Sequence, residues 1–140
     1  MKMRFPKKSV LFICTHNAVR SQMAEAFLNN IYRDRYTSFS AGSDPTQIDP
    51  LVTSVMSEIG IDVSNHQSKG LDVFKDSKMD YIVTVCDLAH ESCPYFPGGK
   101  LHLHRSFPDP SKFDGKDEDK IKEYRCIRDA IKKWIEEEFG

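Results

Sequence analysis

The sequence predicts an α/β fold: a doubly wound, four-stranded parallel sheet with helices on both faces. Short apolar runs that suit buried strands alternate along the chain with segments whose apolar residues recur at helical spacing. Such alternation is typical of parallel sheets, whose crossover helices cover the faces. The 140 residues contain neither an internal repeat nor a low-complexity segment, so we expect one domain over residues 1–140.

The first half of the chain predicts two strands and two helices. A first strand is expected at residues 9–13 and a first helix at residues 21–32, where apolar side chains share one face. A short second strand follows at residues 37–41. The second helix is expected to begin at Asp49-Pro50, a capping residue before a proline in the first helical position, and to stop at Gly60.

The second half predicts two more strands and a long final helix. A weak helical stretch near residues 71–74 precedes residues 81–85, the clearest buried strand, and residues 100–103 form a weaker fourth strand. The final helix is expected from residue 117 or 119 to about residue 139. Its apolar stripe consists of Ile121, Tyr124, Ile127, Ile131, Trp134 and Ile135.

The amino-acid composition restricts the binding partners and the cellular compartment that we expect for this protein. Lys and Arg number 20 against 21 Asp and Glu, and the formal charge of −1 argues against nucleic acid as the main partner. Residues 1–8 lack the apolar core of a signal peptide, and no apolar stretch is long enough to span a membrane. We therefore expect a cytoplasmic protein. In that compartment a disulfide is more often catalytic than structural, so the cysteines at positions 14, 86, 93 and 126 are considered first as reactive groups.

The loop between the first strand and the first helix carries the strongest chemical signal. It reads Cys14, Thr15, His16, Asn17, Ala18, Val19 and Arg20, and Ser21 follows. Backbone N–H groups of such a loop and of the helix N-terminus favour negative charge, which predicts a site for a tetrahedral oxyanion. The same field favours a reactive thiolate at Cys14. Arg20 offers a fork of donors for phosphate-like oxygens, and Ser21 a hydrogen bond to the sulfur. The alternative is a strand-end cysteine packed as a small apolar side chain.

Two further cysteines follow the third predicted strand. Cys86 ends residues 81–85 as Cys14 ends residues 9–13, and neighbouring parallel strands would bring these ends within disulfide range. Cys93 comes seven residues later in a mostly polar segment. The three sulfurs would then form a relay, and the alternative is that Cys14 and Cys86 are unrelated, one of them belonging to the core.

A zinc site is the competing use of these sulfurs. The candidate ligands are Cys86, His90 and Cys93, with His102 or His104. Structural zinc sites usually show tighter paired spacing than two cysteines with a single histidine between them. We therefore predict no metal, and we interpret Cys126, which lies off the apolar stripe of the final helix, as a partly exposed bystander.

One carboxyl group completes the candidate site. Asp109 lies between two prolines, which stiffen its loop and hold the carboxyl group in place. Near a thiolate and a bound oxyanion, such a group would serve as general acid for a leaving oxygen. The alternative is an aspartate that starts a turn.

Together these pieces resemble the thioredoxin-coupled arsenate reductases built on the low-molecular-weight protein tyrosine phosphatase fold. The resemblance runs from the first strand into the last helix. It is carried by residues 10–15, 17, 20–25, 40–42, 61–66, 83–86, 93–94 and 109–110. The cysteine triplet is its specific part, because plain phosphatases keep the loop and the aspartate but lack the second and third cysteines.

The resemblance implies a mechanism without a cofactor. Cys14 attacks arsenate, Arg20 holds its oxygens, and Asp109 helps water to leave. Cys86 then attacks the Cys14–arsenic adduct, arsenite departs, and a Cys14–Cys86 disulfide forms. Cys93 next attacks Cys86, and the resulting Cys86–Cys93 disulfide is presented to thioredoxin.

Three departures from the family pattern bear on this expectation. His16 and Val19 replace a glycine and an inner cysteine found in many family loops. Some members bind potassium beside the loop with the help of an aspartate, and here Lys69 takes that position, where its ammonium would replace the ion. Ser111 to Phe113 follow Asp109-Pro110 where phosphotyrosine phosphatases often carry tyrosines, which weakens the phosphotyrosine interpretation.

Two other functions remain open on the sequence. A phosphatase of phosphotyrosine or of a small phosphoester needs only Cys14, Arg20 and Asp109, and such hydrolysis is also conceivable as a weak side activity. A non-catalytic redox sensor or oxyanion-binding protein would record oxidation in its cysteines, and a partner would recognise the resulting loop movement.

Overall fold

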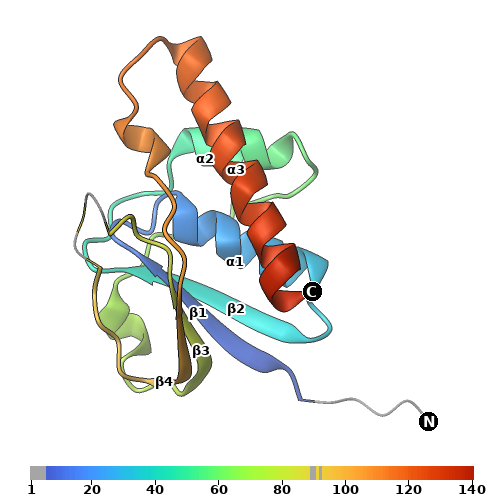
Figure 1. The fold of residues 1–140 in the computed structure, drawn as a ribbon, viewed down its shortest axis with the longest axis vertical. Coiled ribbons are helices and arrows are strands. Elements are labelled where there is room, and N and C mark those ends of the chain that lie inside the picture. Colours follow the sequence, from blue (N-terminus) through green and yellow to red (C-terminus); the bar gives the residue numbers. More distant parts are fainter. Residues whose placement is uncertain (1–5, 89–90, 92) are drawn as a thin grey trace.

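The computed structural model describes residues 6–88, 91 and 93–140. Its strands are β1 (Lys8–Cys14), β2 (Tyr36–Gly42), β3 (Met79–Thr84) and β4 (Gly99–His104), and they form one parallel sheet in the order β2-β1-β3-β4 (Figure 1). The predicted four-stranded parallel sheet is confirmed. Each strand begins one or two residues before its expected start, because the pairing of backbone groups continues beyond the apolar run.

The helices lie where the pattern predicts them, except that the second α-helix ends at Ser57, three residues before its expected stop at Gly60. They are α1 (Arg20–Ile31), α2 (Pro50–Ser57) and α3 (Asp117–Phe139), with the short 3-10 helices η1 (Leu71–Phe74) and η2 (Pro110–Lys112). Asp49 caps α2, since its carboxylate accepts a hydrogen bond from the N–H of Leu51 at 3.0 Å. None of the helices within the described residues has the length and apolar composition that crossing a bilayer requires.

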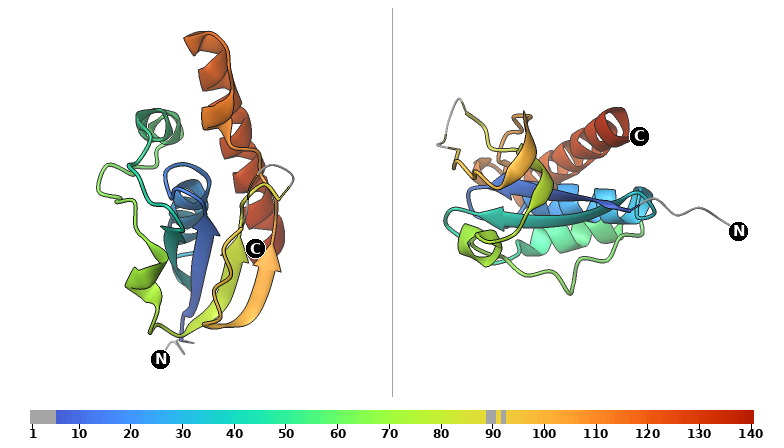
Figure 2. Two further views of the ribbon diagram at one scale, coloured as in Figure 1. Left: turned by 90° about the vertical axis from the view of Figure 1, so that its left-hand side faces the viewer. Right: turned by 90° about the horizontal axis from the view of Figure 1, so that it is seen from below.

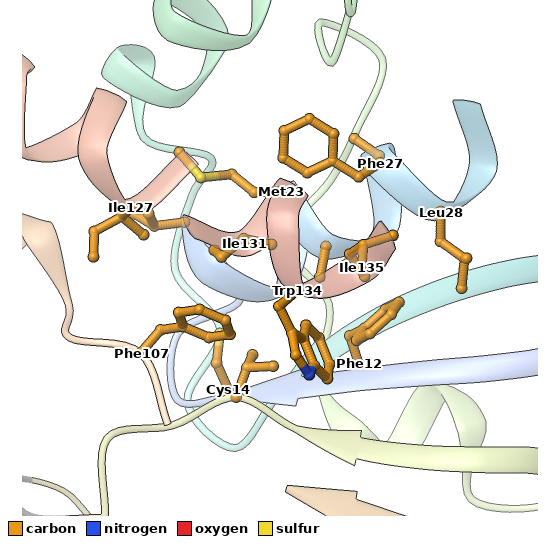
Figure 3. Close-up of a cluster of buried hydrophobic side chains, with 14 of the residues drawn as sticks. Phe12, Cys14, Met23, Phe27, Leu28, Phe107, Ile127, Ile131, Trp134 and Ile135 are labelled. Carbon is orange, nitrogen blue, oxygen red and sulfur yellow. The ribbon is translucent and has the colours of Figure 1, made fainter. Parts of the chain in front are cut away.

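The two faces of the sheet are covered unequally. Val10, Phe12 and Cys14 of β1 face one cluster of buried side chains, to which α1, α2 and α3 all contribute. Figure 3 shows Phe12 and Cys14 with the side chains of α1 and α3 in this cluster. Leu11 and Ile13 face a second, smaller cluster that contains η1. In Figure 1 the α-helices lie above the strands and η1, in lime green, lies below them, and the right-hand view of Figure 2 looks onto the η1 side. The predicted helices on both faces are thus three α-helices on one face and a single 3-10 turn on the other.

The order of the strands places the reactive end of the sheet. The chain moves from β1 to β2 on one side and then crosses to β3 on the other side of β1. Ligand sites of open α/β sheets form at such a reversal, beyond the carboxyl ends of the strands. Cys14 is the last residue of β1, and Cys86 follows the end of β3 by two residues.

Candidate active site

The loop between β1 and α1 is held from outside through its carbonyl groups. Three of them, on Thr15, His16 and Ala18, accept hydrogen bonds from the backbone N–H groups of Asp44, Thr46 and Asp49 at 2.8, 3.3 and 3.3 Å. In a trans peptide the N–H points away from the C=O, so the N–H groups of the following residues face the other way. The loop therefore directs N–H donors at the space that it encloses, as an anion site requires.

Asn17 locks the loop in a conformation that few residues adopt. Its φ of 52° lies in the left-handed region, and its side chain is fully buried. The side-chain oxygen accepts hydrogen bonds from the N–H of Lys69 and from Nε2 of Gln22, both at 2.8 Å. The side-chain nitrogen donates to Oγ of Ser21, also at 2.8 Å. These bonds over-determine the strained residue and so fix the loop.

Ser21 connects the fixed Asn17 side chain to the sulfur of Cys14. The Ser21 Oγ lies 2.8 Å from the Cys14 Sγ. Because this oxygen already accepts a hydrogen bond from Asn17, its own hydrogen can point at the sulfur. A hydroxyl that donates to sulfur stabilises a thiolate, as the sequence predicted for Ser21.

The end of β2 lies directly against the loop. A Cβ added to Gly42 would come within 2.8 Å of the Asn17 nitrogen and would overlap the Thr15 carbonyl oxygen. Both obstacles are backbone atoms of the loop, which cannot swing away as a flexible side chain would. Glycine at position 42 is therefore required for the loop to approach β2.

His16 fits the loop without strain. The left-handed conformation is adopted by Asn17 and not by His16. Position 16 therefore does not need the backbone freedom of a glycine, and the histidine is accommodated without strain. The imidazole Nδ1 of His16 lies 2.9 Å from the carbonyl oxygen of Asp44, at the mouth of the site. We infer that Nδ1 carries the hydrogen in this contact, since a carbonyl oxygen can only accept.

Arg20 is buried at the start of α1 with its donors turned into the site. Its exposed fraction is 2%, and its Nη1 donates to the carbonyl oxygen of Phe107 at 3.2 Å. The terminal nitrogens bind the Glu91 carboxylate, with Nη2 3.2 Å from Oε2. Burial lowers the pKa of Arg20, but the hydrogen bond to Glu91 and the nearby negative groups outweigh burial and raise it. Its Nε is buried and has no hydrogen-bond partner among the described residues, so it is available to a bound oxyanion.

Asp109 is held in one orientation over the same cavity. One of its carboxylate oxygens accepts hydrogen bonds from the N–H and the hydroxyl of Ser111, at 3.0 and 2.7 Å. The other oxygen lies 3.6 Å from Nη2 of Arg20. Cys14, Arg20 and Asp109 line a cavity of about 260 Å³. Asp109 thus starts a turn and also faces the site, which joins the two roles weighed on the sequence.

The second and third cysteines are joined to each other. Cys86 and Cys93 form a disulfide with a Cα separation of 5.8 Å, while Cys14 is a free thiol. The Cys86 sulfur lies 3.8 Å from the carbonyl oxygen of Ile13, the residue before Cys14. Cys86 is fully buried, whereas Cys93 is half-buried. The structure therefore places Cys86 beside the end of β1 and Cys93 nearer the surface.

Within the described residues the candidate zinc ligands form no group that could hold a metal ion, although His102 and His104 line the same groove as Cys93. Both thiols are consumed by the disulfide, and His90 lies outside the described residues. His102 is exposed and stacks on Tyr95, and His104 contacts the hydroxyls of Thr84 and Ser106. Cys126 is exposed on α3, as predicted.

A buried carboxylate lies behind the loop. Glu25 accepts a hydrogen bond from the Ser40 hydroxyl at 2.8 Å, and the His66 Nδ1 lies 3.3 Å from its other oxygen. The Lys69 ammonium lies 4.0 Å from Glu25 and donates to the carbonyl oxygen of Gln67 at 2.9 Å. Lys69 therefore supplies a positive charge next to the buried carboxylate.

Two residues near the site were missed on the sequence. Tyr124 of α3 donates a hydrogen bond to Asp49, and burial together with this bond raises the pKa of Tyr124. Glu91 binds Arg20, and although burial raises the pKa of Glu91, the hydrogen bonds from Arg20 and from the Asp87 N–H lower it overall. The only sequence signal for Glu91 is a carboxylate between two cysteines, which does not identify Arg20 as its partner.

The chain is similar to known proteins over nearly its whole length. Residues 9–138 match the low molecular weight phosphotyrosine protein phosphatase family. The chain is 40% identical to the arsenate reductase of Halalkalibacterium halodurans, over 92% of this chain and 93% of that protein. It is 38% identical to arsenate reductase 2 of Staphylococcus haemolyticus, over 93% of this chain and 95% of that protein.

Solved structures give the same picture. The thioredoxin-dependent arsenate reductase of Corynebacterium glutamicum has a TM-score of 0.63 and is 34% identical to this chain. The match covers 94% of this chain and 63% of that chain. The similarity thus extends from the loop and the sheet to the last helix.

Proposed function

The chain belongs to the low molecular weight phosphotyrosine protein phosphatase family and, within it, to the arsenate reductases, and from this premise we propose that it reduces arsenate to arsenite through Cys14, Cys86 and Cys93. One observation carries the proposal. The Cys86–Cys93 disulfide begins beyond the end of β3, directly beside the strand that ends in the Cys14 thiol. Phosphoester hydrolysis would leave the second and third cysteines without a task.

The first step is attack on the oxyanion held by the loop. The Cys14 thiolate attacks the arsenic of arsenate and forms a sulfur–arsenic bond, while Arg20 and the loop N–H groups bind the remaining oxygens. Asp109 donates a proton to the departing oxygen, which leaves as water. The position of Asp109 next to Arg20 supports this role.

The next two steps are thiol exchanges. The Cys86 thiolate attacks the Cys14 sulfur, the sulfur–arsenic bond breaks, and its electron pair stays on arsenic, which departs as arsenite. The Cys93 thiolate then attacks the Cys86 sulfur and releases Cys14 as a thiolate. A free Cys14 beside a Cys86–Cys93 disulfide is the product of this sequence, and it is the arrangement found here.

A dithiol protein of the thioredoxin class would reduce this disulfide and close the cycle. Cys93 lines a groove of about 410 Å³ together with Leu88 and Tyr95, whereas Cys86 is fully buried. The reductant should therefore attack the Cys93 sulfur and take over the Cys86–Cys93 disulfide. Since thioredoxin keeps thiols reduced in the cytoplasm, we assign the enzyme to that compartment.

Phosphoester hydrolysis is the second candidate function. The loop, Arg20 and Asp109 line one cavity with Cys14, which is the set that such hydrolysis requires. We assign it as a weak side activity of the same site. A redox sensor without catalysis would bind oxyanions at this site and release no arsenite.

The test couples arsenate to NADPH oxidation through thioredoxin and thioredoxin reductase, with aryl phosphate hydrolysis measured in parallel. The wild type should consume NADPH only when arsenate is added. Cys14→Ser should abolish both activities, and Arg20→Lys should impair both because a point charge cannot give bidentate contacts. Cys126→Ser, on an exposed position of α3, is the matched control. A Cys14→Ser enzyme that keeps most of its reductase activity would contradict the assignment of Cys14 as the nucleophile.

A further inference from the structure

The Glu91 carboxylate binds the guanidinium group of Arg20, which the proposed oxyanion site also needs. The two terminal nitrogens of Arg20 face its two carboxylate oxygens, an arrangement that the oxygens of a tetrahedral oxyanion can also satisfy. The Arg20 and Glu91 side chains are only 2% and 10% exposed, so the pair is shielded from water. While Glu91 is bound, only Nε of Arg20 is left for an oxyanion, and the two-point contact through the terminal nitrogens is lost.

The position of Glu91 is tied to the disulfide. Glu91 lies inside the ring that the Cys86–Cys93 bond closes. Within this ring the Asp87 N–H donates to Oε1 of Glu91 at 2.7 Å, and the Glu91 N–H donates to the carbonyl oxygen of Asp87 at 2.9 Å. The ring starts at Cys86, which is buried beyond the end of β3, so its closure keeps Glu91 next to the loop.

We propose that Glu91 is a redox-gated internal competitor: with the Cys86–Cys93 disulfide formed, its carboxylate holds Arg20 and excludes the substrate oxyanion, and reduction of the disulfide by a dithiol releases Arg20. The inference rests on the proposed oxyanion site. It gives the cycle an order, because the oxidised enzyme binds new arsenate only weakly until its thiols are restored. By linkage, an oxyanion should favour the reduced form by the same factor that the reduced form favours the oxyanion.

Calorimetric titration with inorganic phosphate tests this gate, which is the competition of Glu91 for Arg20 while the Cys86–Cys93 disulfide is formed. The oxidised chain should bind phosphate about tenfold or more weakly than the chain reduced with dithiothreitol, as expected when the competent state is the minor one. Glu91→Gln and Glu91→Ala should bring the oxidised chain close to the affinity of the reduced chain. Glu138→Gln, which removes one negative charge from an exposed position of α3, should keep the full difference between the two forms.

Two outcomes would overturn the gate alone. One is equal phosphate affinity of the oxidised and reduced wild type. The other is a gain of affinity in Glu91→Gln that is equal in both forms, since the contact would then not depend on the disulfide. If the reduced wild type bound no phosphate and turned over no arsenate, the oxyanion site itself would fail, and the gate with it.

Discussion

The hydroxyl oxygen of Ser21 lies 2.8 Å from the sulfur of Cys14 and accepts a hydrogen bond from Asn17, which leaves the Ser21 hydrogen free to point at the sulfur. Asn17 is itself held by the N–H of Lys69 and by Gln22. The Cys14 sulfur is therefore the last member of a chain of hydrogen bonds that begins outside the loop.

Ser21→Ala should slow the chemistry of Cys14 without removing the thiol. A hydrogen bond to a charged group contributes roughly 1.5–3 kcal/mol, which corresponds to a rate loss of about tenfold to a hundredfold. Iodoacetamide alkylation of Cys14 at neutral pH and steady-state arsenate reduction should both fall by this order. Ser57→Ala, at an exposed position of α2, should alkylate like the wild type. Unchanged alkylation of Ser21→Ala would remove Ser21 from the site.

The relay predicts different dead ends for Cys86→Ser and Cys93→Ser. Cys86→Ser should stop after Cys14 has bound arsenic, because no thiol remains at the end of β3 to release arsenite. Cys93→Ser should release arsenite once and then hold a Cys14–Cys86 disulfide. Mass spectrometry after arsenate treatment should find that disulfide in Cys93→Ser and Cys86–Cys93 in the wild type.

These two variants also separate reductase from phosphatase. Both keep the loop and Asp109, so weak aryl phosphate hydrolysis should survive in each. Sustained thioredoxin-driven reduction by both variants would contradict the relay and leave the phosphatase function in the lead.

Asp109→Asn should lower turnover while oxyanion binding persists. The amide keeps an oxygen for Ser111 but has no proton of suitable acidity to give to the leaving oxygen. General acids typically contribute about 10²–10⁴-fold, so single-turnover arsenate reduction should slow within that range. Phosphate affinity serves as the internal control. An unchanged single-turnover rate would leave Asp109 as a turn residue.

Gly42→Ala should damage the loop from the neighbouring strand. The added methyl group meets backbone atoms of Thr15 and Asn17, and such overpacking costs roughly 1–3 kcal/mol of unfolding free energy. Urea unfolding and phosphate titration should both show the loss. In Gly115→Ala the new methyl group meets the ring of Phe113, which is 38% exposed and can move, so stability should stay near the wild-type value.

The contact between Glu91 and Arg20 predicts a pH-dependent part of the stability of the oxidised chain. Because the pKa of Glu91 is lowered in the folded state, its contribution is complete above the ordinary value of 4.5 and is lost as the pH falls through the folded value. Urea midpoints of the oxidised wild type should therefore decrease more steeply below that pH than those of oxidised Glu91→Gln. Parallel profiles of the two proteins would show that the pair adds no stability.

Local patterns carried most of the fold. The apolar run before Cys14 predicted the central strand, and the stripe through Tyr124, Ile131 and Ile135 predicted the long last helix, because both depend on the spacing of neighbours in the chain. The unequal covering of the sheet could not be predicted in this way. It depends on which side of the sheet α2 packs, and its amphipathic pattern is compatible with either side.

The residues of the candidate site also differ in whether a local sequence pattern could predict them. Cys14, Arg20 and Ser21 belong to one contiguous segment, so their proximity follows from the strand, loop and helix that the segment forms. Glu91 reaches Arg20 across 71 positions of the chain, and no local pattern specifies such a partner. Asp109 falls between these cases: its prolines indicated rigidity, while its position beside Arg20 appears only in the folded chain.

The carbonyl groups of Thr15, His16 and Ala18 take their hydrogen bonds from backbone that comes after β2. The proposed oxyanion site is therefore assembled only when β1, α1 and the start of α2 have docked together. A partly folded chain should have no affinity for phosphate, so phosphate should stabilise the reduced native state by mass action and raise its melting temperature with concentration. For the same reason, the anion should protect the whole chain from proteolysis and not the loop alone.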